Sequence, residues 1–307
     1  MAGNRHRLPR AILKRREAEI RPRLPRLARL LLKLQSRVGR PASLRREKLP
    51  VKRILRRAAG RVQPRRDAER AADCDEQQPL GRQIRAAQDS EITVENVIGQ
   101  RYIGCGSTDR KITVHGTAGN GLGQYLNGST IVVFGNAQEA VGDTMNAGSI
   151  IVHGSVGDTA GYAMRGGAIY VQGNAGYRAG VHMKAYQDTL PVMVIGGRTG
   201  SFLGEYQAGG LILVLGLHQD GKPIASNFPC TGMHGGKLIL RSDCSHLLFP
   251  PQVTTHLADE DELQEIRHYV AEYCRLFDQD ADAIMDSPFT VVTPDSNNPY
   301  KQMYVAN

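Results

Sequence analysis

The sequence predicts an all-β protein, a single-stranded β-helix of about six coils, because three features recur at one spacing. Glycine returns every 19 residues, with one gap of 24, and this first glycine column consists of Gly116, Gly135, Gly154, Gly173, Gly197 and Gly216. Alternating apolar pairs share the spacing, and 30 of the 34 glycines lie between residues 92 and 242. So short a unit cannot bury an apolar side alone, so the coils must stack on one another.

Each coil is expected to contain a short strand. Apolar residues two positions apart recur at fixed offsets: Ile112/Val114, Ile131/Val133, Ile150/Val152, Ile169/Val171, Ile212/Val214 and Leu238/Leu240. Alternation with a period of two is typical of a strand with one buried face. Stacking at about 4.8 Å per coil predicts a stem about 25 to 30 Å long.

Three further columns follow the repeat. A second glycine column consists of Gly123, Gly142, Gly161, Gly180 and Gly204. We expect both glycine columns to serve turns with φ > 0, which glycine adopts without a side-chain clash. A polar column, expected to hydrogen-bond along the stem, consists of Thr117, Asn136, Ser155 and Asn174. An apolar column, expected to be core, consists of Leu126, Met145, Met164 and Met183, and Gln207 interrupts it.

The first part of the chain, residues 1–75, has a different composition. Residues 1–72 hold 24 Lys or Arg and 5 Asp or Glu, a net charge of +19, whereas the other 235 residues have a net charge of −10. Scattered prolines oppose long helices, so this basic tail is expected to be disordered. Three interpretations stay open: a solvated arm without a specific partner, an arm that binds nucleic acid or an acidic surface, and an upstream stretch that is never translated.

The repeat domain is expected to span residues 90–245. Two insertions interrupt its coils, at residues 182–191 and 218–229. Irregular loops of repeat proteins are frequent contact sites, so we expect partners to dock there.

Residues 246–307 contain no glycine and form a third region. Apolar residues at helical spacing and an acidic start predict an amphipathic helix over Asp259–Phe277. We expect this helix to cap the open end of the stem, since an uncapped β-helix exposes unpaired backbone groups. Phe289–Val292 and residues 294–307 are expected to form an extended tail that lies along a partner.

Five widely spaced cysteines without a CxxC pair exclude a disulfide framework, a zinc knuckle and an iron–sulfur site. They indicate a reducing compartment, and with no secretory or membrane-spanning segment in the sequence, we expect a cytoplasmic protein.

Candidate catalytic patterns are sparse. The run Gly119–Gly123 resembles a phosphate-binding loop but lacks the preceding strand and following helix that such a loop requires. His115 and His153 lie two coils apart, about 10 Å, and therefore cannot share one metal ion. Glu205 and His234 stand in near-equivalent parts of successive coils, which leaves a metal or acid–base role open.

The coils resemble a known family. The stretches that match are Gly135–Gly148, Gly154–Gly167 and Gly173–Gly180, together with His182–Lys184, Gly200–Tyr206 and Thr231–Gly236. They are similar to the GXGXG domain, which closes the large subunit of glutamate synthase, and look closest to stand-alone glutamate-synthase-like subunits. A related domain forms one of the subunits of formylmethanofuran dehydrogenase. The resemblance covers about residues 90–280 and excludes the basic tail.

The resemblance implies a right-handed β-helix without catalytic, cofactor-binding or metal-binding residues of its own. Glutaminase and FMN-dependent synthase activities, with FMN and iron–sulfur groups, are then expected in partner subunits of a glutamate-synthase-like complex for glutamate biosynthesis. The expected partner interface contains His182, Lys184, Glu205, Tyr206 and His234. Two alternatives stay open: a component of a formylmethanofuran dehydrogenase or formyl-transferring complex, and a nucleic-acid-binding module that uses residues 1–72.

Overall fold

The structure is a computed structural model that describes residues 78–217 and 219–296. The predictions for the basic tail and for the end of the extended tail lie outside these residues. In chain order the elements are α4 (Pro79–Ala86), β1 (Glu91–Ile98), β2 (Lys111–Thr117), β3 (Asn127–Phe134), β4 (Ala147–Val152), β5 (Ala168–Val171), β6 (Val192–Ile195), β7 (Ala208–Val214), β8 (Gly235–Leu240), β9 (Val253–Leu257), α5 (Glu260–Phe277), α6 (Ala281–Met285) and β10 (Thr290–Pro294).

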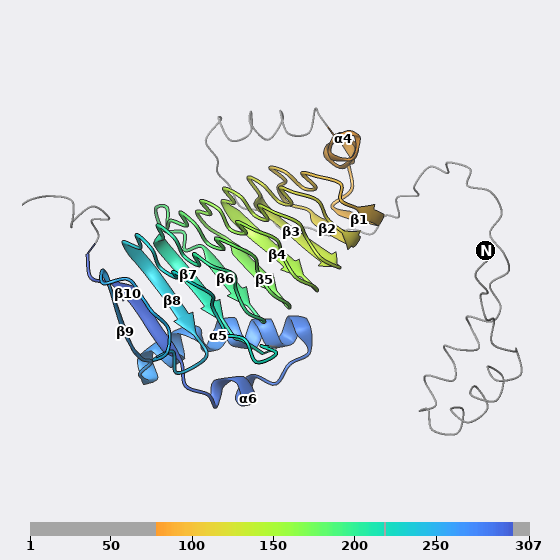
Figure 1. Cartoon of the computed structure of the whole chain (residues 1–307). Coiled ribbons are helices and arrows are strands. Elements are labelled where there is room, and N and C mark those ends of the chain that lie inside the picture. The colour runs from red at the N-terminus through yellow and green to blue at the C-terminus, as the bar shows by residue number, and fades with distance from the viewer. Residues whose placement is uncertain (1–77, 218, 297–307) are drawn as a thin grey trace, which may run out of the picture. The chain divides into compact units, whose positions relative to one another are not determined.

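The strands β1 to β8 stack in chain order as parallel neighbours, and they form a β-solenoid of about seven turns (Figure 1). Strand pairing follows the glycine repeat, because Ile112 pairs with Ile131, Ile131 with Ile150 and Ile150 with Ile169. The predicted solenoid is therefore confirmed. It has more turns than the expected six because β1 precedes the first coil that the glycine column marks.

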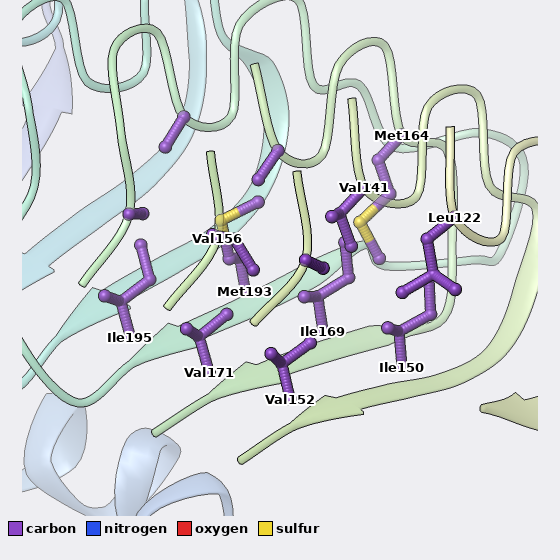
Figure 2. Close-up of a cluster of buried hydrophobic side chains, with 14 of the residues drawn as sticks. Leu122, Val141, Ile150, Val152, Val156, Met164, Ile169, Val171, Met193 and Ile195 are labelled. Carbon is purple, nitrogen blue, oxygen red and sulfur yellow. The ribbon is translucent and has the colours of Figure 1, made fainter. Parts of the chain in front are cut away.

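The interior of the solenoid is a continuous column of apolar side chains. Figure 2 shows strand residues such as Ile150, Val152 and Ile169 facing Leu122, Val141 and Met164 from the opposite walls of the coils. The predicted core column is confirmed, since Leu126, Met145, Met164 and Met183 are fully buried. Gln207 is fully buried as well, and its Nε2 donates to the backbone oxygens of Gly210 and Lys237 at 3.1 and 3.3 Å.

Positive φ was the expected reason for glycine throughout the first glycine column. It explains only some of these glycines, and the others have a different physical reason. Gly116, Gly135 and Gly216 do have φ of +121°, +152° and +57°. Gly154, Gly173 and Gly197 have no left-handed φ, so that expectation is wrong for them. They are glycine because adjacent coils approach closely: a Cβ on Gly154 would lie 2.5 Å from the Gly135 oxygen. The expectation holds for the second column, in which φ lies between +64° and +72°.

The polar column forms a ladder of hydrogen bonds between coils. The backbone N–H of Ser155 donates to Asn136 Oδ1 at 2.8 Å, and the N–H of Asn174 donates to Ser155 Oγ at 3.0 Å. Arg198 N–H donates to Asn174 Oδ1 at 2.9 Å, across the insertion that lengthens this coil. The predicted polar contacts along the stem are confirmed for these residues.

The predicted helix is present as α5, and Asp259 and Glu262 form a capping box at its start. It does not cap the end of the stem, which corrects the expectation. Its buried residues, including Ile266 and Val270, pack against outward-facing side chains of β4 to β8 such as Leu213. Strand residues alternate between the two faces, and the outer face of these strands is apolar, so it needs a cover of its own.

The end of the stem is closed by strands instead. β10 pairs antiparallel with β8, and β9 pairs antiparallel with β10 at the margin of the sheet. Phe289–Val292 is therefore not an extended tail, because these residues are buried and largely within β10. At the other end, Ile84 of α4 joins the interior core beside the first coil.

Candidate protein-interaction surface

At the turns of the coils, several residues other than glycine have a left-handed backbone conformation, and some of them have large side chains. One coil has φ of +56°, +72° and +56° at Arg178, Gly180 and His182. The next has +61°, +66° and +52° at Phe202, Gly204 and Tyr206. Left-handed backbone is strained for residues other than glycine and persists only where its surroundings hold it in place.

Hydrogen bonds between coils hold this backbone. The N–H of Arg178 donates to the Ser201 oxygen, and that of His182 to the Glu205 oxygen, both at 2.9 Å. The N–H of Tyr206 donates in the same way to the Thr231 oxygen of the following coil at 2.8 Å. The spacing of two residues therefore repeats from coil to coil and aligns side chains into rows.

Aromatic rings occupy two neighbouring rows. In the first row His182 lies between Tyr162, at 5.9 Å between ring centroids, and Tyr206, at 5.2 Å with nearly parallel rings. In the second row Phe202 contacts Tyr177 at 5.3 Å and Phe228 at 5.2 Å. Tyr162, Tyr206 and Phe228 are exposed, so the rows present apolar area to solvent.

An ion pair joins the two rows. Arg178 Nε lies 2.6 Å from Glu205 Oε2, and the Glu205 side chain is only 10 % exposed. The Arg178 guanidinium also lies 4.8 Å from the ring centroid of Tyr177 and 5.4 Å from that of Phe202. A partly buried carboxylate requires a paired cation, so this contact fixes the relative positions of both rows. We call the rings of both rows and this pair the ring surface: Tyr162, Tyr177, Arg178, His182, Phe202, Glu205, Tyr206 and Phe228.

The structure brings together His182, Glu205 and Tyr206 from the interface that the sequence predicts. His234 lies one coil further on, where its Nδ1 contacts the Gly232 oxygen at 3.0 Å. Gly232 in turn lies beneath the Tyr206 ring, since a Cβ there would be 2.5 Å from that ring. Lys184 is exposed, and the ion pair consists of Arg178 and Glu205 without it.

Sequence reasoning missed Arg178, Phe202 and the two flanking tyrosines. A signal was available, because Arg178 and Phe202 each stand two residues before a glycine of the second column. Their left-handed backbone explains that position. What the spacing could not reveal is that these side chains meet across coils of unequal length.

The first insertion and the described part of the second, residues 219–229, form loops, as expected. In the first, Tyr186 and Thr189 form a small antiparallel bridge, and Tyr186 and Leu190 are about half exposed. The second borders a hollow of about 270 Å³ that is lined by residues including Phe228, Pro229 and Leu248. Whether partners dock on these loops stays a prediction.

Thiols and clusters of metal ligands are the reactive groups considered among the described residues. Cys230, Cys244 and Cys274 are buried free thiols, and burial raises their pKa, which disfavours the nucleophilic thiolate. Over residues 78–217 and 219–296 no three potential metal ligands cluster.

The histidine pair and the glycine-rich run that the sequence analysis considered as possible binding patterns both have structural roles. The His115 and His153 rings sandwich the Phe134 ring at 5.0 and 4.6 Å, so they stack rather than converge. In the run Gly119–Gly123, the N–H groups of Gly121 and Gly123 donate to neighbouring coils, so they cannot cradle a phosphate.

The stacked coils define a β-solenoid protein, and the ring surface lies along its turns. A family model for the GXGXG motif matches residues 67–294, and the chain belongs to this family. It is also similar to an uncharacterized protein of Methanocaldococcus jannaschii, with 40% identity over 222 residues, 70% of this chain and 85% of that protein. None of the described helices is long and apolar enough to cross a membrane.

Proposed function

We propose that this protein is a non-catalytic structural subunit of a glutamate-synthase-like complex in the cytoplasm. It supports glutaminase and FMN-dependent synthase subunits in glutamate biosynthesis, and FMN and iron–sulfur groups belong to those partners. The observation that carries the proposal is the GXGXG family match over residues 67–294, because in glutamate synthase the domain that these coils resemble packs between the catalytic domains.

The ring surface supports a role in assembly. Tyrosine, phenylalanine and arginine are enriched in protein interfaces. The aromatic rings bury a large area at a small cost in side-chain entropy, and the arginine guanidinium adds charge-assisted contacts and stacking on rings. Here the backbone ladder and the Arg178–Glu205 pair hold the rings before any partner arrives. A surface that is already ordered loses less entropy on binding, which favours affinity.

The test is a native purification of the full chain from its own cells, with mass spectrometry of the recovered subunits and a flavin absorbance scan. We expect an amidotransferase-like chain and a flavin-containing synthase chain in the eluate. The double variant Arg178→Ala, Tyr206→Ala should lose both. Phe134→Ala, which removes a similarly exposed ring on the strand side of the coils, is the matched control and should retain them.

Three outcomes would contradict the proposal. Glutamine turnover by the purified chain alone would make it an enzyme. Recovery of formyl-transferring subunits, or of nucleic acid released by moderate salt, would move the protein to one of the alternative classes.

A further inference from the structure

The sheet has two edge strands, and they differ in whether their unpaired backbone groups are protected from pairing with another chain. β1 forms one margin, where Glu91 and Glu95 place charges and a bulge lies between Val94 and Val97. Charges and bulges at a margin oppose pairing with another chain. β9 forms the margin at the other end of the described residues.

β9 has neither form of protection. Its sequence, Val253–Leu257, contains no Lys, Arg, Asp, Glu or Pro, and its register with β10 is regular over all five residues. Its residues after Val253 are exposed, and Leu257 is 58 % exposed. An exposed, uncharged and regular margin is a template for pairing with another strand.

The hydrogen bonds beside β9 show which of its groups face outward. The Ala258 N–H donates to the Phe289 oxygen at 2.8 Å, and the Gln252 oxygen accepts from the Asp295 N–H at 2.9 Å. Antiparallel pairs alternate, so Thr254 and His256 also face β10. The N–H and C=O groups of Thr255 and Leu257, and the carbonyl of Val253, therefore point away from the sheet.

We propose that β9 is a self-association edge, at which two copies of this chain pair antiparallel about a two-fold axis through Thr255. In this register Thr255 lies opposite Thr255 of the other copy, and Val253 lies opposite Leu257. The N–H groups of Thr255 and Leu257 and the carbonyls of Val253 and Thr255 then gain partners, whereas the Val253 N–H already donates to the Pro250 oxygen at 3.3 Å. The two apolar ends of the strand also cover each other, as cross-strand pairs do.

The charges around the edge fit a second copy in this register. The acidic start of α5 follows β9 directly, and extending the antiparallel pairing places Asp259 opposite Pro251 of the other copy. His256, whose Nε2 lies 3.0 Å from Glu262, comes opposite Thr254. Like charges are thus kept from meeting, and the strand is self-complementary, as a two-fold interface requires.

Cysteine cross-linking of the full chain tests the register. Paired residues of this type have Cα atoms about 5.5 Å apart, within disulfide range, so Thr255→Cys should form a covalent dimer under mild oxidation. Thr254→Cys is the matched control, because Thr254 lies opposite His256 and should cross-link poorly. Equal cross-linking of both variants, or of neither, would overturn the proposed pairing.

Native mass spectrometry tests the association itself. The unmodified chain should have twice the 33.6 kDa chain mass, and Leu257→Lys should halve it. Ile98→Lys, at an 85 % exposed position of the opposite margin, should remain dimeric. A monomeric unmodified chain, or a dimeric Leu257→Lys, would overturn the proposal. If the chain is monomeric and deletion of residues 297–307 makes it dimerise, this C-terminal segment is the occupant instead.

Discussion

At the scale of single residues, glycine meets two different needs in this fold. Glycines of the second column supply a left-handed turn in each coil. Gly154, Gly173 and Gly197 instead leave room for the backbone of the preceding coil. The two needs predict different responses to substitution, because the first costs backbone strain and the second a collision between main chains.

Gly154→Val should destabilise the protein by more than about 3 kcal/mol, because its side chain would collide with the Gly135 oxygen and Asn136 Oδ1. Urea unfolding measures the change. Gly221→Ala is the control: its φ is left-handed but no atom lies within 4 Å of the added Cβ, so about 1 kcal/mol is expected. Equal losses for both variants would contradict a packing role for Gly154.

His153 should make stability depend on pH. Desolvation lowers its pKa, so the unfolded chain binds a proton more readily than the folded protein does. The free energy of unfolding that neutral His153 supports is therefore fully present above the ordinary pKa of 6.5, and it is lost as the pH falls below that value. His153→Phe keeps a ring against Phe134 and Phe277, and its melting temperature should fall less between pH 7.5 and 5. An identical pH profile would contradict this account.

At the scale of elements, each face of the strands has its own cover. The inner faces pack against the walls of the coils, while α5 covers the outer faces of β4 to β8. Tyr273 ties this helix to the stem, since its hydroxyl donates to the Gln172 oxygen at 3.2 Å.

Ile266→Ala should cost about 2 to 5 kcal/mol, because the side chain is fully buried between α5 and the sheet. Thermal unfolding checks this loss. Gln264→Ala on the exposed side of the same helix should change stability by no more than about 0.5 kcal/mol. A helix that did not contribute to the fold would give equal, small changes for both variants.

At the scale of the whole molecule, charge and core belong to different parts of the chain. Net positive charge is confined to residues 1–72, and the buried apolar residues of the described part begin at Ile84. The core that the described residues form therefore begins after the basic segment in the chain.

Deletion of residues 1–72 should leave the melting temperature unchanged, and circular dichroism during heating checks this. If the full chain binds nucleic acid, that binding should fall steeply with salt and disappear in the deletion variant. Retained binding would place the nucleic-acid contact on the acidic solenoid, contrary to its charge.

The repeat was predictable because it is local. The offset of 19 residues between Ile112, Ile131 and Ile150 is the strand register itself, and the glycine columns recur in the coils from β2 onward. The start of α5 was predictable in the same way, since the Asp259 cap and its acidic first turn are adjacent in the chain.

The ring surface was only half predictable. His182, Glu205 and Tyr206 were among the residues expected at a partner interface. The contacts of Arg178 with Glu205 and with the Phe202 ring were not expected, because they cross a coil lengthened by an insertion. Sequence spacing does not show which side chains face one another once coils differ in length.

The sequence alone determined that this chain is a stacked β-solenoid, because identical units can bury their apolar sides only against one another. Tertiary structure alone decided what closes its ends and sides. α5 has the pattern of any amphipathic helix, so only the apolar outer face of the sheet directed it there rather than to the end of the stem. At that end β10 pairs with β8, and β9 pairs with β10, because another strand supplies the backbone hydrogen bonds that a helix cannot supply to a strand edge.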